Sequence, residues 1–143
     1  MSKGVKFKEA IGLDNLKIID DKILSAYLTD GSDINVDFVI VGIGVTPNTK
    51  LAEGAKLKIN NGIFVNGMCQ TSIANIYAAG DCTSFNYKNT LVRLESVGNA
   101  IDQAMIVAQN IMKQDTSYLP KPWFWSDQYD LKLQIAGLNT GYD

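Results

Sequence analysis

The sequence predicts an α/β fold, and three observations support this prediction. The continuous apolar run Phe38–Val41 is typical of a strand that is buried on both faces. A second run, Ile76–Ala79, ends abruptly in Gly80 and Asp81, as expected of a buried parallel strand whose carboxyl end meets a ligand. Across Val97–Met112, apolar residues recur at steps of three and four, which predicts an amphipathic helix packed on a sheet.

The residues before the first apolar run favour antiparallel strands. Leu16–Ile19 and Ile23–Thr29 flank a short turn at Asp20–Lys22, and Asp30-Gly31 marks a second turn. Strict alternation across Asp33–Asp37 then predicts a strand with one face in water.

Shorter signals define the remaining elements. Thr46–Asn48 contains a proline and breaks the first buried strand, and Thr49–Ala55 is predicted to form one short helical turn. Ile63–Val65 is predicted to be a further short strand. Ser96 is expected to be the N-cap of the long helix, and Lys113 suits its C-terminal end.

Composition excludes several classes of function. The chain has 143 residues, a net charge of -2 and no basic cluster, which argues against nucleic acid as a partner. It has no histidine, so neither a Ser-His nor a Cys-His catalytic pair can form, and a transition-metal site is unsupported. No apolar run approaches the ~18 residues that span a membrane, and nothing at the N-terminus resembles a signal peptide, so we expect a cytoplasmic protein without membrane association.

The two cysteines do not form a recognisable motif. Cys69 and Cys82 are too far apart for a CxxC pair or a metal cluster, and both are expected to be structural thiols. A redox disulfide between them is not expected in a reducing compartment.

Gly80 and Asp81 form the most informative pair in the sequence. Gly80 lacks a side chain, so another backbone or a cofactor can come close, and Asp81 offers an acceptor that suits ribityl or ribose hydroxyls. Taken alone, Asp81 could equally cap a turn after the strand.

Three motifs together resemble a known family. Thr71-Ser72 followed by Ile76–Asp81 resembles the second flavin-binding motif of the flavoprotein reductases that have two dinucleotide-binding domains. Asp37–Asn48 and Pro122–Asp130 narrow the resemblance to the ferredoxin and rubredoxin reductases of oxygenase electron-transfer chains. The resemblance implies FAD as cofactor, NAD(P)H as electron donor, and a ferredoxin or rubredoxin as electron acceptor.

The resemblance also implies an architecture. It is a partial FAD/NAD(P)-binding, Rossmann-like fold followed by the start of an α+β C-terminal domain. Residues 1–58 would complete the NAD(P)-binding domain, residues 59–117 would return to the FAD-binding domain, and residues 118–143 would begin the C-terminal interface domain. The Gly42-Ile43-Gly44 turn lacks the third glycine of a pyrophosphate-binding turn, so we expect a portion of a reductase that is inactive in isolation.

The resemblance assigns cofactor-binding residues but no catalytic or metal-binding residue. The segment that begins the long helix would meet the pyrimidine edge of the flavin, and Trp125 would lie at the flavin edge or docking surface, with Trp123 mainly in packing. Gly42 and Gly44 would lie near the nicotinamide site, although glycines there could simply end a strand. The expected cofactor-binding residues are Gly80, Asp81, Glu95, Ser96, Val97, Trp125, Gly42 and Gly44.

Two alternatives remain open. The chain could be a non-catalytic module that complements a second polypeptide carrying the glycine-rich turns. It could also belong to a disulfide- or peroxide-reducing flavoprotein of the same architecture, with its redox cysteines outside this segment. In each case, apolar faces left uncovered would make self-association possible.

Overall fold

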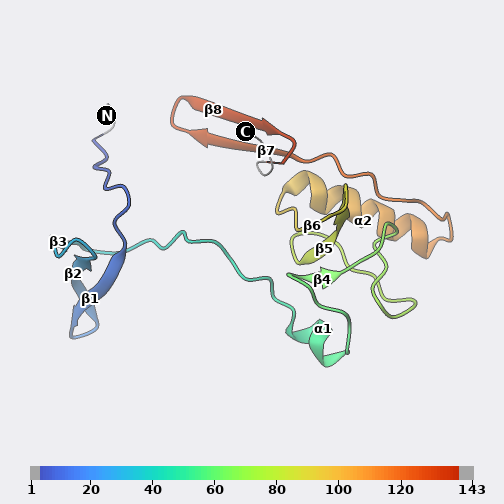
Figure 1. Cartoon of the computed structure of the whole chain (residues 1–143), viewed down its shortest axis with the longest axis horizontal. Coiled ribbons are helices and arrows are strands. Elements are labelled where there is room, and N and C mark those ends of the chain that lie inside the picture. The colour runs from blue at the N-terminus through green and yellow to red at the C-terminus, as the bar shows by residue number, and fades with distance from the viewer. Residues whose placement is uncertain (1–3, 139–143) are drawn as a thin grey trace. The chain divides into compact units, whose positions relative to one another are not determined.

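Two units make up the residues that the computed structural model describes, 4–138, and they divide between Gly44 and Val45 (Figure 1). Each unit is described by itself. The expected domain boundaries at residues 58/59 and 117/118 stay predictions.

The first unit is an antiparallel sheet with the strand order β1-β2-β3. Asp20 and Asp21 connect the first two strands, and both have positive φ, at 50° and 58°. This conformation suits a two-residue hairpin turn, because its twist matches that of the strands. The predicted antiparallel strands are therefore confirmed as β1 (Leu13–Ile19), β2 (Lys22–Leu28) and β3 (Asp33–Asn35).

The prediction of a buried strand at Phe38–Val41 was wrong for the described chain. This segment forms no strand, and Ile40 is 85% exposed. A strand that is buried on both faces needs hydrogen-bonded neighbours and covering side chains, and no described residue pairs with this segment as a strand.

The second unit contains a small mixed sheet, two helices and a separate hairpin (Figure 1). The sheet has the order β4-β5-β6, with β4 parallel to β5 and β5 antiparallel to β6. The short helix after Thr49 and the strand at Ile63 confirm two predictions. The elements are α1 (Lys50–Gly54), β4 (Ile63–Phe64), β5 (Thr83–Tyr87), β6 (Thr90–Val92), α2 (Val97–Ile111), β7 (Trp123–Gln128) and β8 (Leu131–Ala136).

The core of the second unit lies between the sheet, α2 and the segment after α2. Phe85 and Tyr118 meet edge to face at 5.5 Å between ring centroids. Val65, Cys69 and Leu94 complete the buried cluster. This core joins β4, β5 and the residues on both sides of α2.

The predicted strand at Ile76–Ala79 is also absent. The nearest ladder contact is an isolated bridge between Gln70 and Tyr77, and the Ala78 N–H donates to the Cys69 carbonyl at 3.1 Å. A parallel strand needs a continuous ladder, and the described residues provide only these local contacts. Gly80 and Asp81 therefore follow an extended loop rather than a strand.

The long helix is confirmed, but its orientation differs from the prediction. Its buried side chains are Asn99, Gln103 and Asn110, which are polar. The predicted apolar stripe instead faces outward, as the exposed side chains of Val97, Ile101, Ile111 and Met112 show, and Met105, one turn after Ile101, is exposed as well. Lys113 lies just beyond α2.

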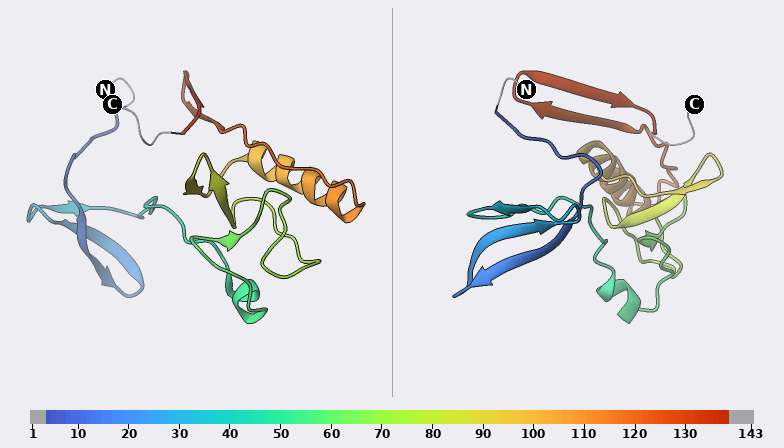
Figure 2. Two further views of the ribbon diagram at one scale, coloured as in Figure 1. Left: turned by 45° about the vertical axis from the view of Figure 1, so that its right-hand side comes forward. Right: turned by 60° about the vertical axis from the view of Figure 1, so that its left-hand side comes forward.

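The chain turns back after α2 and runs along the helix toward its N-terminal end, where β7 begins (Figures 1 and 2). Asn110 holds this return, because its side chain donates to the carbonyls of Met68 and Thr116 and accepts from the Thr116 N–H. The return brings the aromatic hairpin close to the start of α2. Among residues 4–138, no helix has the length and apolar character needed to cross a membrane.

Candidate functional site

The turn at Gly80 fixes where Asp81 lies. Gly80 has φ of +88°, and a Cβ at this position would lie 3.5 Å from the Ala100 Cβ. Its N–H donates to the Gln103 Oε1 at 2.7 Å, and its carbonyl accepts from the Thr83 N–H at 2.9 Å. Both polar groups of this residue are thus held, and Asp81 stands exposed at the outer end of the turn.

The start of α2 is fixed from two sides. The Ser96 Oγ accepts from the Asn99 N–H at 3.2 Å, so Ser96 is the N-cap that the sequence predicts. The Asn99 side chain donates to the Leu94 carbonyl at 2.9 Å and accepts from the Tyr118 hydroxyl at 2.6 Å. These bonds fix the segment that leads into the helix, whose N-terminus carries partial positive charge.

Glu95 forms an ion pair at the edge of the site. Its carboxylate pairs with the guanidinium of Arg93, whose side chain is only 13% exposed. The same guanidinium approaches the Val45 carbonyl at 3.5 Å. Arg93 thus compensates the charge of Glu95, whereas no cation among residues 4–138 pairs with Asp81, which lines the same pocket as the helix N-terminus.

Two tryptophans from β7 stack on one another. The rings of Trp123 and Trp125 lie 5.1 Å apart at an angle of 27°, and the Trp123 indole N–H donates to the Gln134 Oε1. Both indoles stay partly exposed, at 41% and 46%. Phe124, on the opposite face of the strand, packs against the core.

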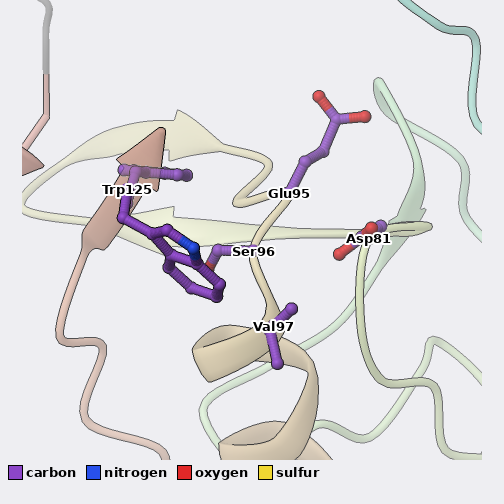
Figure 3. A pocket seen from close by; sticks show the side chains of 6 residues that line it. Asp81, Glu95, Ser96, Val97 and Trp125 are labelled. Carbon is purple, nitrogen blue, oxygen red and sulfur yellow. The ribbon is translucent and has the colours of Figure 1, made fainter. Parts of the chain in front are cut away.

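These parts surround one pocket of about 270 Å³ (Figure 3). The Trp125 indole points toward the start of α2 (Figure 3). The volume lies just below the range of about 300–1,000 Å³ for drug-sized ligands, so the pocket suits one ring system rather than a whole dinucleotide. Its lining residues are Asp81, Glu95, Ser96, Val97, Phe124 and Trp125.

The structure brings together five of the eight predicted site residues in this pocket, and Gly80 sets the turn beside it. Phe124 was not predicted, although it lies beside Trp125 in the Pro122–Asp130 motif. An aromatic wall, a helix N-terminus and a carboxylate acceptor fit a planar heteroaromatic ring that carries a hydroxylated chain. The pocket residues therefore fit the flavin part of FAD.

Gly42 and Gly44 belong to the first unit, and both are exposed. Gly44 has φ of +95°, which favours glycine, whereas a Cβ at Gly42 would meet no described atom within 4 Å. Their expected role near a nicotinamide stays a prediction.

The two cysteines have different surroundings, and both are free thiols. Burial raises the pKa of the Cys69 thiol to about 11. Burial, with the nearby charges of Asp102 and Cys69, raises the pKa of the Tyr118 hydroxyl to about 12. Cys82 is half-buried, and its sulfur lies 3.7 Å from the Ala79 carbonyl.

Sequence reasoning missed the polar residues that support the pocket from behind. Asn99 and Gln103 are four residues apart and lie on the inward side of α2, where each bonds to a segment of the site. Their spacing was a usable signal, because polar side chains one helical turn apart share a face.

Two family models match the chain. One, described as pyridine nucleotide-disulphide oxidoreductase, matches residues 1–104, and one described as reductase C-terminal matches residues 123–143. The first model alone covers more than half of the sequence.

Named proteins of similar sequence and structure are reductases. Rhodocoxin reductase from Rhodococcus erythropolis is 42% identical over 98% of this chain and 33% of its own length. A rubredoxin-NAD(+) reductase from Pseudomonas putida is 38% identical over 99% of this chain and 37% of its own length. The crystal structure of the ferredoxin reductase for the CYP199A2 system from Rhodopseudomonas palustris aligns with a TM-score of 0.87 at 40% identity, covering 93% of this chain and 33% of that chain. The chain thus spans about a third of the length of the curated relatives that it matches.

Proposed function

The chain belongs to the pyridine nucleotide-disulphide oxidoreductase family, and from this premise we propose that it forms part of an FAD-dependent NAD(P)H reductase. In this proposal, electrons pass from NAD(P)H through FAD to a ferredoxin or rubredoxin. The observation that carries the proposal is the pocket in which Asp81, the start of α2 and Trp125 converge. The names of the similar reductases support the choice of electron acceptor.

Each side of the pocket has a separate task. The Asp81 carboxylate would accept hydrogen bonds from the ribityl hydroxyls, and Gly80 keeps its turn free of a side chain. Trp125 offers an aromatic face or edge to the flavin ring. FAD, when bound, accepts a hydride from NAD(P)H and releases its electrons singly.

The N-terminus of α2 would set the electronic character of the ring. Its partial positive charge favours negative charge on the pyrimidine edge, by about 0.3–1 kcal/mol per favourable contact. An effect of this size shifts a reduction potential but does not supply the chemistry. The Arg93–Glu95 pair supports the same role, because compensation of Glu95 limits repulsion of an anion.

Docking of the electron acceptor and the cellular location complete the proposal. In this proposal the electron acceptor docks on the hairpin side, and the exposed parts of Trp123 and Trp125 support this choice. A cytoplasmic location is supported by the two free thiols, since thiols persist in a reducing compartment.

One alternative also has a specific observation in its favour. The outward apolar stripe on α2 is exposed, and the chain spans about a third of its relatives, so a module that completes a second polypeptide fits both facts. A disulfide- or peroxide-reducing role is less well supported, because its redox cysteines would lie outside this chain and the Pro122–Asp130 motif resembles that of the ferredoxin and rubredoxin reductases.

A chimera provides the experiment. The 143-residue chain would replace the matching third of rhodocoxin reductase from Rhodococcus erythropolis, and NADH-dependent reduction of cytochrome c through an added ferredoxin would be measured. We expect the chimera to reduce cytochrome c at a ferredoxin-dependent rate. Asp81→Asn should lower this rate by about tenfold, and Asp102→Asn should change it by less than twofold. A folded, FAD-loaded chimera without any ferredoxin-dependent rate would contradict the proposal.

A further inference from the structure

Gln103 is fully buried on the inward side of α2, a place where a glutamine needs partners. Its Oε1 accepts a hydrogen bond from the Gly80 N–H at 2.7 Å, and it lies 2.9 Å from the Thr83 hydroxyl, whose single proton it shares with the Gly80 carbonyl at 2.8 Å. Both donors belong to the turn that carries Asp81. A helix side chain more than 20 residues away along the sequence therefore holds this turn.

The bonds around Gly80 act on one short segment from two directions. Gln103 holds the amide of Gly80, and the Thr83 N–H holds its carbonyl. The Ala100 Cβ, 3.5 Å from where a Gly80 Cβ would lie, limits the space on the helix side. Asp81 follows directly, so the orientation of the Gly80 peptide groups determines where its carboxylate points.

We propose that Gln103 is a positioning residue of the pocket, whose amide oxygen fixes the turn that directs Asp81 to the ligand. The identity of that ligand as a flavin rests on the proposed function. The oxygen of Gln103 carries the task, because its Nε2 is buried without a hydrogen-bond partner among the described residues. A side chain of the same shape that keeps the oxygen should therefore replace glutamine.

Two substitutions separate the oxygen from the shape of the side chain. Gln103→Met keeps the length and loses the acceptor. Gln103→Glu keeps an acceptor oxygen, and at pH 5 its carboxyl is expected to be protonated, because burial raises the pKa of a carboxyl group. Gln109→Met is the matched control, since it makes the same change elsewhere on α2. Val65→Ala tests general destabilisation, because Val65 lies in the core.

Amide hydrogen exchange in the full 143-residue chain measures directly how well the Gly80 amide in this turn is protected. The reference is the amide of Val65, whose N–H donates to the Ser84 carbonyl. At pH 5, we expect Gln103→Met to lower the protection factor of the Gly80 amide at least tenfold relative to this reference. Gln103→Glu should restore protection to within about threefold, and Gln109→Met should leave it unchanged. Should Gln103→Met fail to fold, Gln103→Leu, which also lacks the acceptor oxygen, carries the test with the same expected loss of protection at Gly80.

Titration of the flavin-free chimera with FAD separates the failure of this inference from failure of the proposed function. We expect Gln103→Met to weaken FAD binding by the chimera by about tenfold and Gln103→Glu at pH 5 to restore it. If the unsubstituted chimera binds no FAD while the protection of Gly80 depends on Gln103, the flavin assignment fails and the positioning role stands. If Gly80 is equally protected with and without the Gln103 oxygen, or if Val65→Ala exposes it to the same extent, the positioning role is overturned.

Discussion

At the scale of single residues, the site depends on two kinds of side chain. Some, such as Asp81, face the ligand, and others, such as Gln103, hold the facing residues in place from behind. Asp81 was predictable because a glycine and a carboxylate follow an apolar run, which is a local pattern. Gln103 was not, because its importance arises from a bond to Gly80, a residue distant in the sequence. Local patterns thus identify the groups that face a ligand, whereas the residues behind them depend on tertiary contacts.

The raised pKa of the buried Cys69 thiol predicts that the protein loses stability at alkaline pH. Its thiol has a pKa of 9.0 in its ordinary state and about 11 in the fold, so the folded state binds more protons between these values. The contribution is fully present below pH 9 and is lost as the pH rises toward 11, by up to about 3 kcal/mol in free energy of unfolding. Urea unfolding at pH 8 to 11, followed by tryptophan fluorescence, measures this loss.

The control is Cys69→Ala, which has no thiol to titrate. The variant should start from a lower stability and lose less between pH 9 and pH 11. The Tyr118 hydroxyl, whose pKa is about 12, should cause a smaller loss of unfolding free energy at alkaline pH in both proteins. Equal slopes for the two proteins would show that Cys69 does not titrate as described.

At the scale of elements, α2 organises the site because its start lines the pocket and its inward side holds the surrounding loops. The bounds of this helix were predictable from the spacing of its apolar residues and from the N-cap at Ser96. Its orientation was not, because the predicted apolar stripe faces outward, while the inward side combines buried polar side chains with Ile106 and Val107, which pack against the core. A periodic pattern identifies two faces of a helix, but the neighbouring elements decide which one is covered.

Ser96→Ala tests the start of this helix. Loss of the bond from the Asn99 N–H to the Ser96 Oγ should lower the free energy of unfolding by about 1 kcal/mol. Ser117→Ala, at an exposed position after the helix, is the matched control and should change stability by less than about 0.5 kcal/mol. Denaturant unfolding of both variants measures the difference, and equal effects would rule out a capping role.

Gly62→Ala tests the parallel pairing of β4 with β5, because Gly62 directly precedes β4. Gly62 has φ of +129°, and a Cβ there would lie 2.8 Å from the Cys82 carbonyl oxygen, which cannot move freely because the Ile63 N–H donates to it. We expect a loss of at least about 1–3 kcal/mol in unfolding free energy. Gly67→Ala, where a Cβ meets no described atom within 4 Å, should cost far less, and thermal unfolding compares the two.

At the scale of the whole molecule, the predicted α/β class is confirmed, but two predicted strands are missing. Phe38–Val41 and Ile76–Ala79 have the composition of buried strands and no continuous ladder among the described residues. Strand formation depends on neighbours that can be remote, whereas the antiparallel strands β1 and β2 form because their partners are adjacent in sequence. This difference explains why the hairpin of β1 and β2 was predictable and these two strands were not, although the local hairpins β5–β6 and β7–β8 were not predicted either.

The uncovered apolar surface predicts self-association of the 143-residue chain. Ile101 and Met105 lie on the exposed stripe of α2, at 55% and 58% exposure. Light scattering coupled to size exclusion should give a mass above 15.6 kDa that rises with concentration. Ile101→Glu with Met105→Glu should return the mass toward the monomer, and Gln109→Glu should not. A constant monomer mass in the unmodified chain would contradict this prediction.

The most direct test of the flavin pocket is to titrate the rhodocoxin reductase chimera, freed of its flavin, with FAD and to follow the quenching of flavin fluorescence. The chimera is used because the 143-residue chain alone lacks the pyrophosphate-binding turn. We predict saturable binding of one FAD per chimera. Trp125→Leu and Asp81→Asn should each weaken it by roughly five- to tenfold, about 1 kcal/mol, through lost stacking and a lost hydrogen bond. Asp102→Asn, a change of the same kind outside the pocket, should leave the affinity within twofold. The absence of saturable binding, or equal affinities for all four proteins, would contradict the assignment of this pocket to the flavin.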